Sequence, residues 1–256
     1  MKIFIVNLKT SQDRRAKIDA QLQNLHISGE FIDAVDGRLL SEQERQRFCQ
    51  NINYAFLPGE IGCALSHQKI YRRMIDEEID AAVVLEDDIA LTNDFKDVIQ
   101  NIHIPNHFPA VILLSRSNKY FAKPLSKITE THFLHKTLHA TTTHSYIINR
   151  KAAHSLLSGL YPVWMVADKW GLFEDLSLIT VYSVVPHPVT LSEEAETSTI
   201  NIPEEAQNIH KKKKELWRSL MSKRPLTAKI KHRYRRGILP LFNKVINQGK
   251  GQPSQF

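Results

Sequence analysis

An apolar segment that runs directly into three consecutive carboxylates constrains this chain more than any other feature. Residues 81–85 read Ala-Ala-Val-Val-Leu and are followed by Glu86, Asp87 and Asp88. A short apolar run of this kind is typical of a buried strand, whose side chains alternate between the two faces of a sheet. Glu86 and Asp88 should therefore share one face, and Asp87 should point to the other. In open α/β sheets ligands bind beyond the carboxyl ends of strands, so the pattern predicts a binding site here.

Two carboxylates on one face suit a divalent cation. Mn²⁺ and Mg²⁺ prefer carboxylate and phosphate oxygens, and Mg²⁺ sites commonly use only one or two protein carboxylates. We therefore predict that Asp88 and Glu86 bind Mn²⁺ or Mg²⁺, which would bridge to a substrate phosphate. His187, between two prolines after the apolar stretch 178–185, is a candidate further ligand. A solvated acidic turn that only ends the strand is the alternative.

Apolar segments with the lengths of strands alternate with helical patterns over most of the chain. The expected strands cover residues 2–8, 30–35, 81–89, 110–114, 145–148 and 178–185. Strands that alternate with helices indicate an α/β fold with a mostly parallel central sheet. The 256 residues, 42% of them hydrophobic, suffice for one large domain with an appendage.

The sequence shows no pattern of a membrane span or an export signal. No apolar run approaches the roughly 20 residues of a transmembrane helix. The first eight residues lack the length and the cleavage site of a signal peptide and read as a strand, so we expect a cytoplasmic protein. Cys49 and Cys63 have no metal-ligand spacing and are predicted to be free thiols.

Further polar residues are predicted at the same edge of the sheet. Arg14 and Arg15 fall in the first turn of a helix, where the macrodipole opposes positive charge, so they are better explained by contact with an anion such as a diphosphate than by solvation. Asp36 follows the second strand, although its turn with Gly37 explains it equally well. His67 flanks an apolar helical stripe and is either a core-edge residue or a ligand contact.

An aromatic segment surrounds a single carboxylate later in the chain, where Trp164 and Trp170 flank Asp168. Aromatic faces can stack on a sugar, and a carboxylate can act as a general base. We therefore predict an acceptor side with Asp168 as the base, and Glu174 and Asp175 as reserve candidates. A loop that only packs its tryptophans is the alternative.

Charge is divided unevenly along the chain. Residues 209–256 contain 14 Lys and Arg and one acidic residue, a net charge of +13, whereas residues 1–208 contain 20 basic and 26 acidic residues, a net charge of −6. This division predicts a catalytic domain over residues 1–208 and a basic amphipathic C-terminal segment over residues 209–256. Truncation after about residue 208 should then leave the domain folded.

Aromatic and aliphatic residues are interspersed with the charges of the C-terminal segment: Trp217, Tyr234, Ile238, Leu239 and Phe242. This composition is typical of a segment that lies on an anionic membrane surface. We therefore expect a protein that is peripheral on the inner face of the cytoplasmic membrane. A solvated tail and a nucleic-acid contact are the alternatives.

Short motifs follow one another in a defined order over the first 90 residues. They are Val6-Asn7-Leu8, Asp13-Arg14-Arg15, Ala34-Val35-Asp36-Gly37, Gly59-Glu60-Ile61-Gly62-Cys63 with Leu65-Ser66-His67, and Val84-Leu85-Glu86-Asp87-Asp88-Ile89. This series resembles the ordered motifs of glycosyltransferase family 25, which contains bacterial lipooligosaccharide galactosyl- and glucosyltransferases and the collagen galactosyltransferases. The resemblance extends from residue 2 to about residue 190.

The resemblance implies a GT-A nucleotide-sugar fold, an inverting mechanism and a UDP-hexose donor. It also implies a saccharide acceptor, lipooligosaccharide or another lipid-linked oligosaccharide. Donor-binding residues are expected at Asn7, Arg14, Arg15, Asp36, Glu60, His67, Glu86 and Asp87. Glu86-Asp87-Asp88 takes the place of the Asp-X-Asp metal motif of other GT-A enzymes. Residues 140–144 depart from the glycine-containing pattern that the resemblance implies before Tyr146.

Two other classes of function use parts of the same evidence. A metal-dependent nucleotidyltransferase or phosphohydrolase would need the carboxylates but not the aromatic acceptor side. A nucleic-acid-binding module would use the basic segment alone and leave the acidic strand end unexplained, so we expect no nucleic-acid partner. A glycosyltransferase predicts that the acidic strand end, Arg14 or Arg15, and Asp168 converge on one pocket.

Overall fold

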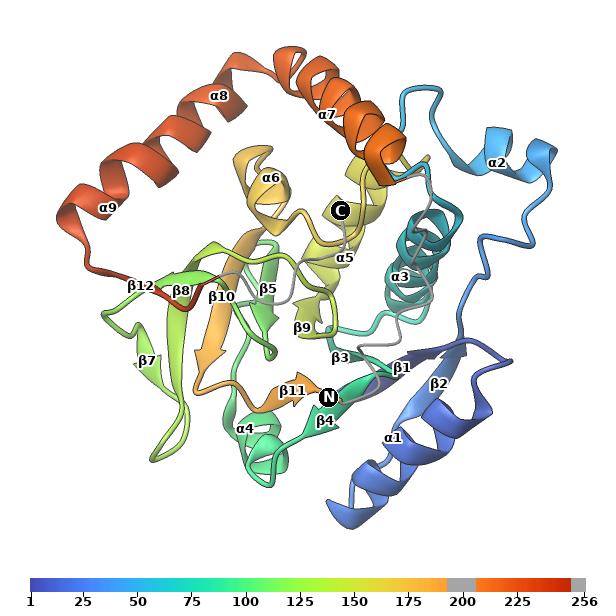
Figure 1. The fold of residues 1–256 in the computed structure, drawn as a ribbon. Helices are drawn as coiled ribbons and strands as arrows, with labels where there is room; N and C mark the ends of the chain where they lie inside the picture. Colours follow the sequence, from blue (N-terminus) through green and yellow to red (C-terminus); the bar gives the residue numbers. More distant parts are fainter. Residues whose placement is uncertain (193–205, 250–256) are drawn as a thin grey trace.

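A ten-stranded sheet runs through the computed structural model, which describes residues 1–192 and 206–249 (Figure 1). The strand order is β12-β6-β8-β10-β5-β9-β3-β1-β2, and β7 pairs with β8. The strands of this sheet are β1 (Lys2–Asn7), β2 (Glu30–Asp33), β3 (Ala81–Glu86), β5 (Ala110–Leu113), β6 (Lys119–Phe121), β7 (Ser126–Lys127), β8 (Phe133–His139), β9 (Ser145–Asn149), β10 (Thr180–Val185) and β12 (Val245–Asn247). A separate pair is formed by β4 (Ile89–Leu91) and β11 (Val189–Leu191).

The α/β class is confirmed, but the sheet is mixed rather than mostly parallel. β1 is parallel to β2 and β3, and β10 is parallel to β5. β9 lies between β3 and β5 and is antiparallel to both, and β8 is antiparallel to β10. All five residues of β9 are buried. A strand that is apolar on both faces has the same sequence pattern in either direction, which is why the pattern did not predict its orientation.

Helices cover both faces of the sheet. They are α1 (Gln12–Asn24), α2 (Glu42–Phe48), α3 (Pro58–Asp76), α4 (Phe95–Asn101), α5 (Arg150–Leu160), α6 (Trp170–Asp175), α7 (Ala206–Ser222), α8 (Leu226–Arg233), η2 (Tyr234–Ile238) and α9 (Leu239–Phe242). Ile3 and Ile5 of β1 belong to the hydrophobic layer of α1 and α4, whereas Phe4 belongs to the layer of α3 and α5. The alternation of strand side chains thus builds two cores, one on each face.

The carboxyl ends of three strands meet at one edge of the sheet. Asn7 at the end of β1 is in register with Asp33 of β2, and Val6 is in register with Glu86 of β3. Asp87 and Asp88 form the turn between β3 and β4. The three consecutive carboxylates therefore lie beside the end of β1 and the start of α1.

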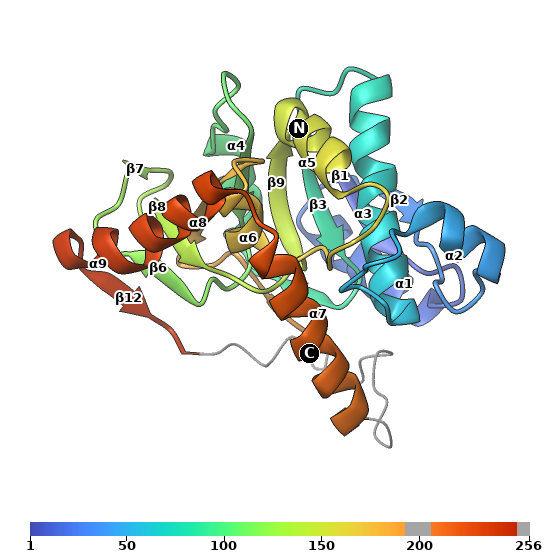
Figure 2. The same ribbon diagram turned by 90° about the horizontal axis from the view of Figure 1, so that it is seen from above.

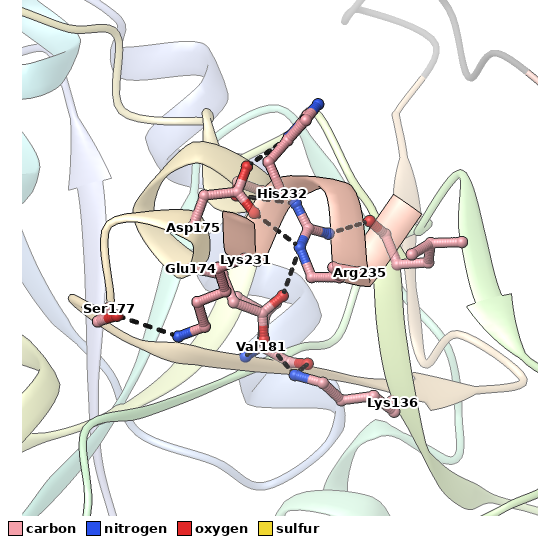
Figure 3. Close-up of polar contacts among 10 residues, drawn as sticks. Lys136, Glu174, Asp175, Ser177, Val181, Lys231, His232 and Arg235 are labelled. Atoms are coloured by element: carbon pink, nitrogen blue, oxygen red, sulfur yellow. Dashed lines mark hydrogen bonds and ion pairs between the residues drawn. The ribbon is translucent and has the colours of Figure 1, made fainter. Parts of the chain in front are cut away.

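The C-terminal segment is integrated into the fold. Figures 1 and 2 show α7, α8 and α9 following one another along the outside of the molecule, and β12 then adds to the sheet beside β6. Lys213 of α7 is buried, and its Nζ donates to both carboxylate oxygens of Glu60 at 2.6 and 2.5 Å. Arg235 of η2 donates to Asp175 at 3.0 Å (Figure 3). These contacts join the residues after 208 to the rest of the fold; that residues 1–208 fold without them stays a prediction.

Candidate functional site

A pocket of about 300 Å³ opens at the carboxyl ends of β1, β2 and β3. The predicted site residues that line it are Arg14, Asp36, His67, Glu86, Asp87 and Asp88. They come from α1, from the segment after β2, from α3 and from the end of β3. The fold thus brings most of the sequence-predicted residues to one place, as expected for the ligand site of an open α/β sheet.

Asp87 connects two of the predicted residues. Its carboxylate accepts a hydrogen bond from Asn7 at 2.7 Å and a contact from Arg14 at 3.4 Å. The guanidinium of Arg14 also lies 3.8 Å from Asp88. Burial raises the pKa of Asp87, although Asn7 and Arg14 oppose that shift. Arg14 therefore supplies positive charge at the place where a diphosphate would need it.

Glu86 is held by a buried hydrogen-bond network that the sequence did not reveal. His67 Nε2 lies 3.3 Å from Glu86 Oε1, and His67 Nδ1 lies 2.7 Å from the Tyr146 hydroxyl. Thr143 donates to the same Glu86 oxygen at 2.5 Å. Burial acts to raise the pKa of Glu86, but these partners and the nearby His144 outweigh it and lower the pKa. The network fixes Glu86 as an ionised acceptor.

The negative charge of Asp88 is only partly compensated by Arg14 and His144. Its Oδ1 is buried and accepts no hydrogen bond from the described part of the chain. Burial, followed by the charges of Glu86 and Asp87, raises the pKa of Asp88 to about 6. A cation would satisfy this oxygen and relieve the repulsion between the carboxylates.

The structure adds His144 to the metal-ligand candidates. Ligand atoms of Glu86, Asp88 and His144 all lie within 4.8 Å of one another. A second group, Cys63 with His67 and Glu86, is also within this distance. Burial raises the pKa of Cys63 well above its usual value, which disfavours the thiolate that binds metals. The residues therefore fit a divalent cation best at Glu86, Asp88 and His144. The only sequence signal for His144 was the unusual composition of residues 140–144.

Asp168 lies near the pocket without lining it. Its Oδ1 is buried and has no hydrogen-bond partner among the described residues. Burial raises its pKa, and Glu86 adds to that shift. The predicted aromatic stacking surface is wrong for Trp170, which is only 1% exposed and donates to the Thr142 carbonyl. Trp164 likewise donates to the Gly159 carbonyl.

Three predicted site residues have other roles. Arg15 lies over the ring of Phe31, 3.9 Å from its centroid, rather than in the pocket. Glu60 is buried in its ion pair with α7. His187 contacts Gln248 at 3.0 Å and belongs to neither of the metal-ligand groups found among the described residues. In each case a long-range packing partner replaced the predicted ligand.

Gly37 and Gly62, which belong to the sequence motifs, allow two backbone segments to pack closely against each other. A Cβ on Gly37 would lie 1.8 Å from the Pro58 carbonyl oxygen, and a Cβ on Gly62 would lie 2.4 Å from the Val35 carbonyl oxygen. The loop after β2 and the first turn of α3 can therefore approach only because both positions lack a side chain. This approach brings Asp36 to the pocket, where Arg38 contacts it and lowers its pKa.

The fold is an α/β sheet with a polar pocket at the carboxyl ends of its parallel strands. Open α/β sheets bind their ligands at this edge, and the chain has the architecture of that class. Residues 1–170 match the family model described as "Glycosyltransferase family 25 (LPS biosynthesis protein)". The chain belongs to glycosyltransferase family 25.

The relatives differ in what is known of their activity. Human procollagen galactosyltransferase 2 is 27% identical over 173 residues, which cover 61% of this chain and 27% of that protein. A Haemophilus influenzae protein with the description "Putative glycosyltransferase" is 26% identical over 190 residues, which cover 71% of this chain and 66% of that protein. Human inactive glycosyltransferase 25 family member 3 is 28% identical over 114 residues, which cover 40% of this chain and 18% of that protein. The chain thus spans about a quarter of the length of human procollagen galactosyltransferase 2.

Among solved structures, a glycosyltransferase involved in the glycosylation of the major capsid of PBCV-1 is similar over 62% of this chain and 64% of that chain. Its TM-score is 0.34 and its sequence identity is 10%.

Proposed function

We propose that this protein transfers a hexose, galactose or glucose, from a UDP-sugar to a saccharide acceptor with inversion at the anomeric carbon. The observation that carries the proposal is the convergence of the family motifs on one pocket. Arg14, His67 and the carboxylates 86–88 are brought there by three separate elements. In this proposal, β1, β2 and β3 with their helices are the GT-A nucleotide-sugar unit, and the pocket receives the donor. We call it the donor pocket.

Glu86, Asp88 and His144 are the residues that would hold Mn²⁺ or Mg²⁺. Two carboxylates suit both ions, and the imidazole favours the transition metal. When bound, the metal would neutralise the charge that develops on the diphosphate leaving group. Arg14 adds positive charge beside it, while the hydrogen bonds from His67 and Thr143 keep Glu86 oriented.

Asp168 is the proposed general base. An inverting transfer needs a group that takes the proton from the acceptor hydroxyl while its oxygen attacks the anomeric carbon. The buried Oδ1 of Asp168, which has no hydrogen-bond partner in the described part of the chain, is available for this task, and a raised pKa makes a carboxylate a stronger base. Glu174 and Asp175 are poor candidates because buried cationic side chains already occupy their oxygens (Figure 3).

Nucleotide binding tests the proposal. UDP with Mn²⁺ should raise the melting temperature more than UDP alone or ADP with Mn²⁺, since a ligand at 100 times its Kd stabilises the native state by about 2.7 kcal/mol. His144→Ala should abolish the Mn²⁺ dependence, whereas His154→Ala, an exposed histidine on α5, should retain it. Equal stabilisation by every nucleotide, or release of UDP without hexose transfer to any saccharide, would contradict the proposal.

A second part of the proposal is that α8, η2 and α9 dock on an anionic bilayer. No helix among the described residues is long and apolar enough to cross one. The exposed apolar residues of this region recur every four positions and continue into α9: Leu226, Ile230, Tyr234, Ile238, Leu241 and Phe242. The opposite face packs on the core through Ala228 and Arg235. Exposed Lys223, Arg233 and Lys244 accompany the apolar stripe, as in helices that lie in a membrane interface.

In this proposal α7 does not contact the bilayer. Trp217, one of the residues predicted from the sequence to face the membrane, packs edge-on against Tyr54 with ring centroids 5.5 Å apart, and Lys213 of the same helix pairs with Glu60. The proposed contact therefore begins at α8. There the protein would meet a lipid-linked saccharide.

Vesicle sedimentation tests the docking. The protein should sediment with vesicles that contain anionic lipid and less with neutral ones, and salt should release it, because each surface Lys or Arg contributes about 1 kcal/mol. Leu241→Ser with Phe242→Ser, at side chains 78% and 80% exposed, should reduce binding without unfolding. Leu125→Ser, at an exposed leucine elsewhere, is the control. Unchanged sedimentation of the double variant would refute the contact.

A further inference from the structure

A second pocket, of about 570 Å³, lies between α7 and the core. Its walls come from α7, from the end of β8 with the loop after it, from the start of α6 and from η2. Six basic side chains line it: His139, Lys169, His210, Lys213, Lys214 and Arg236. None of its lining residues among those described is acidic. We call it the cationic pocket.

Most of these basic side chains form no ion pair within the described part of the chain, although Asp168 attracts Lys169 and Asp175 attracts Arg236 from outside the pocket. Only Lys213 forms an ion pair there, with Glu60. Lys169 instead lies over the ring of Tyr54, 5.5 Å from its centroid. Burial, followed by the charge of Arg236 and other cations, lowers the pKa of His139 to about 4. Burial and Arg235 similarly lower the pKa of Arg236. At both residues the neighbouring cations add to the effect of burial, so their combined charge would attract an anion into the pocket.

The cationic pocket also has an aromatic wall. Trp217 and Tyr54 both line it and contact each other edge-on. An indole face gives a sugar ring an apolar contact, while the charges bind its acidic substituent. Aromatic rings together with basic side chains, most of which form no ion pair among the described residues, match a saccharide that bears a negative charge better than they match a neutral sugar or a simple anion.

Asp168 lies within electrostatic reach of both the cationic pocket and the donor pocket. Lys169, the next residue, lines the cationic pocket, and the charge of Asp168 acts on Tyr54 and Lys213 there. Toward the donor pocket, Glu86 and His144 act on Asp168 itself. The loop after β8 links the two, because Thr141 lines the cationic pocket and His144 belongs to the metal-ligand group.

We propose that the cationic pocket binds the acceptor, and that the acceptor is a saccharide carrying a carboxylate or a phosphate group. This inference rests on the proposed hexose transfer, because it is that reaction which requires an acceptor beside Asp168. The acidic group contacts Lys169, Lys214 and Arg236, and the sugar ring packs against Trp217.

Ligand-observed NMR on the full chain tests this proposal without requiring turnover. The probes are glucuronate and glucose 6-phosphate, with glucose as the neutral sugar and inorganic phosphate and acetate as the free anions. Both anionic sugars should bind more tightly than glucose and than the free anions, and 0.5 M salt should weaken them. Lys214→Ala with Arg236→Ala should weaken them at least tenfold. Lys211→Ala, an exposed lysine on α7 outside the cationic pocket, should change binding less than twofold.

The outcomes separate this proposal from the donor-pocket proposal. UDP binding and the melting temperature should be unchanged in both variants, which shows that any loss is local. The acceptor assignment would be overturned if glucose bound as tightly as glucuronate, or if free phosphate bound as tightly as glucose 6-phosphate. It would also be overturned if the double variant retained wild-type affinity for the anionic sugars. If the protein bound the anionic sugars but did not bind UDP with Mn²⁺, the result would support the cationic pocket as an anionic-sugar site and would refute the proposed hexose transfer.

Discussion

Replacing Lys213 by methionine should destabilise the protein strongly, because it leaves a buried carboxylate without its partner. The side chains of Lys213 and Glu60 are 5% and 7% exposed. The ammonium donates to both Glu60 oxygens and to the Tyr54 carbonyl, at 2.5 to 2.6 Å. Removing one member of a buried ion pair costs about 3–5 kcal/mol. For a chain of this size, where 1 kcal/mol shifts the melting temperature by about 2–4 °C, the melting temperature should fall by roughly 6–20 °C.

A double-mutant cycle isolates the cause. Glu60→Gln removes the charge but keeps an oxygen that can accept the hydrogen bond from the Leu57 amide at the start of α3. Burial raises the pKa of Glu60 and lowers that of Lys213, so the ion pair itself is costly to bury. Lys213→Met with Glu60→Gln should therefore recover most of the stability that Lys213→Met loses. Denaturant unfolding of the wild type, the two single variants and the double variant gives the coupling free energy between Lys213 and Glu60.

The pH dependence provides a further check on the same pair. In Lys213→Met, Glu60 loses the partner that lowers its pKa, so the folded-state pKa rises further above the ordinary value of 4.5. A raised folded-state pKa favours the folded protein below the unfolded pKa, and this contribution is lost as pH rises through the folded pKa. The deficit of the variant should therefore shrink toward pH 4.5 and grow toward neutrality. A loss below about 1 kcal/mol at neutral pH, or a deficit that does not change with pH, would refute the reasoning.

The remaining predictions concern the donor pocket and its frame. Asp88→Asn should abolish Mn²⁺-dependent hexose transfer while raising the melting temperature of the metal-free protein, because it removes a buried charge beside two others; a folded variant that keeps wild-type turnover at saturating Mn²⁺ would exclude Asp88 as a ligand. Arg14→Ala should weaken UDP binding at least tenfold, whereas Arg15→Ala should change it little, because Arg15 lies on Phe31; calorimetric titration with UDP compares them, and equal losses would contradict the structure. Gly62→Ala should cost about 1–3 kcal/mol in denaturant unfolding, since its Cβ would overlap a carbonyl that cannot move away; an unchanged midpoint would refute this contact.

The sequence by itself determined the α/β class and the place of the donor pocket. Both follow from local patterns: an apolar strand predicts its own burial, and the residue after it must lie at the carboxyl edge of the sheet. For that reason the order of residues along the chain was enough to assign Arg14, Asp36 and the carboxylates 86–88 to one edge. The ordered family motifs identified the family for the same reason, because they lie on the segments that form this edge.

Tertiary structure alone decided the partners that are distant in the chain. His144 joins Glu86 and Asp88 only because β9 runs antiparallel beside β3, a direction that an apolar strand does not encode. The basic C-terminal segment looked separable because its charge differs from that of the rest, yet charge composition does not show which lysine is buried. Lys213 reaches Glu60 across 153 positions of sequence. Such a contact depends on how α7 packs against α3, and no local pattern records it.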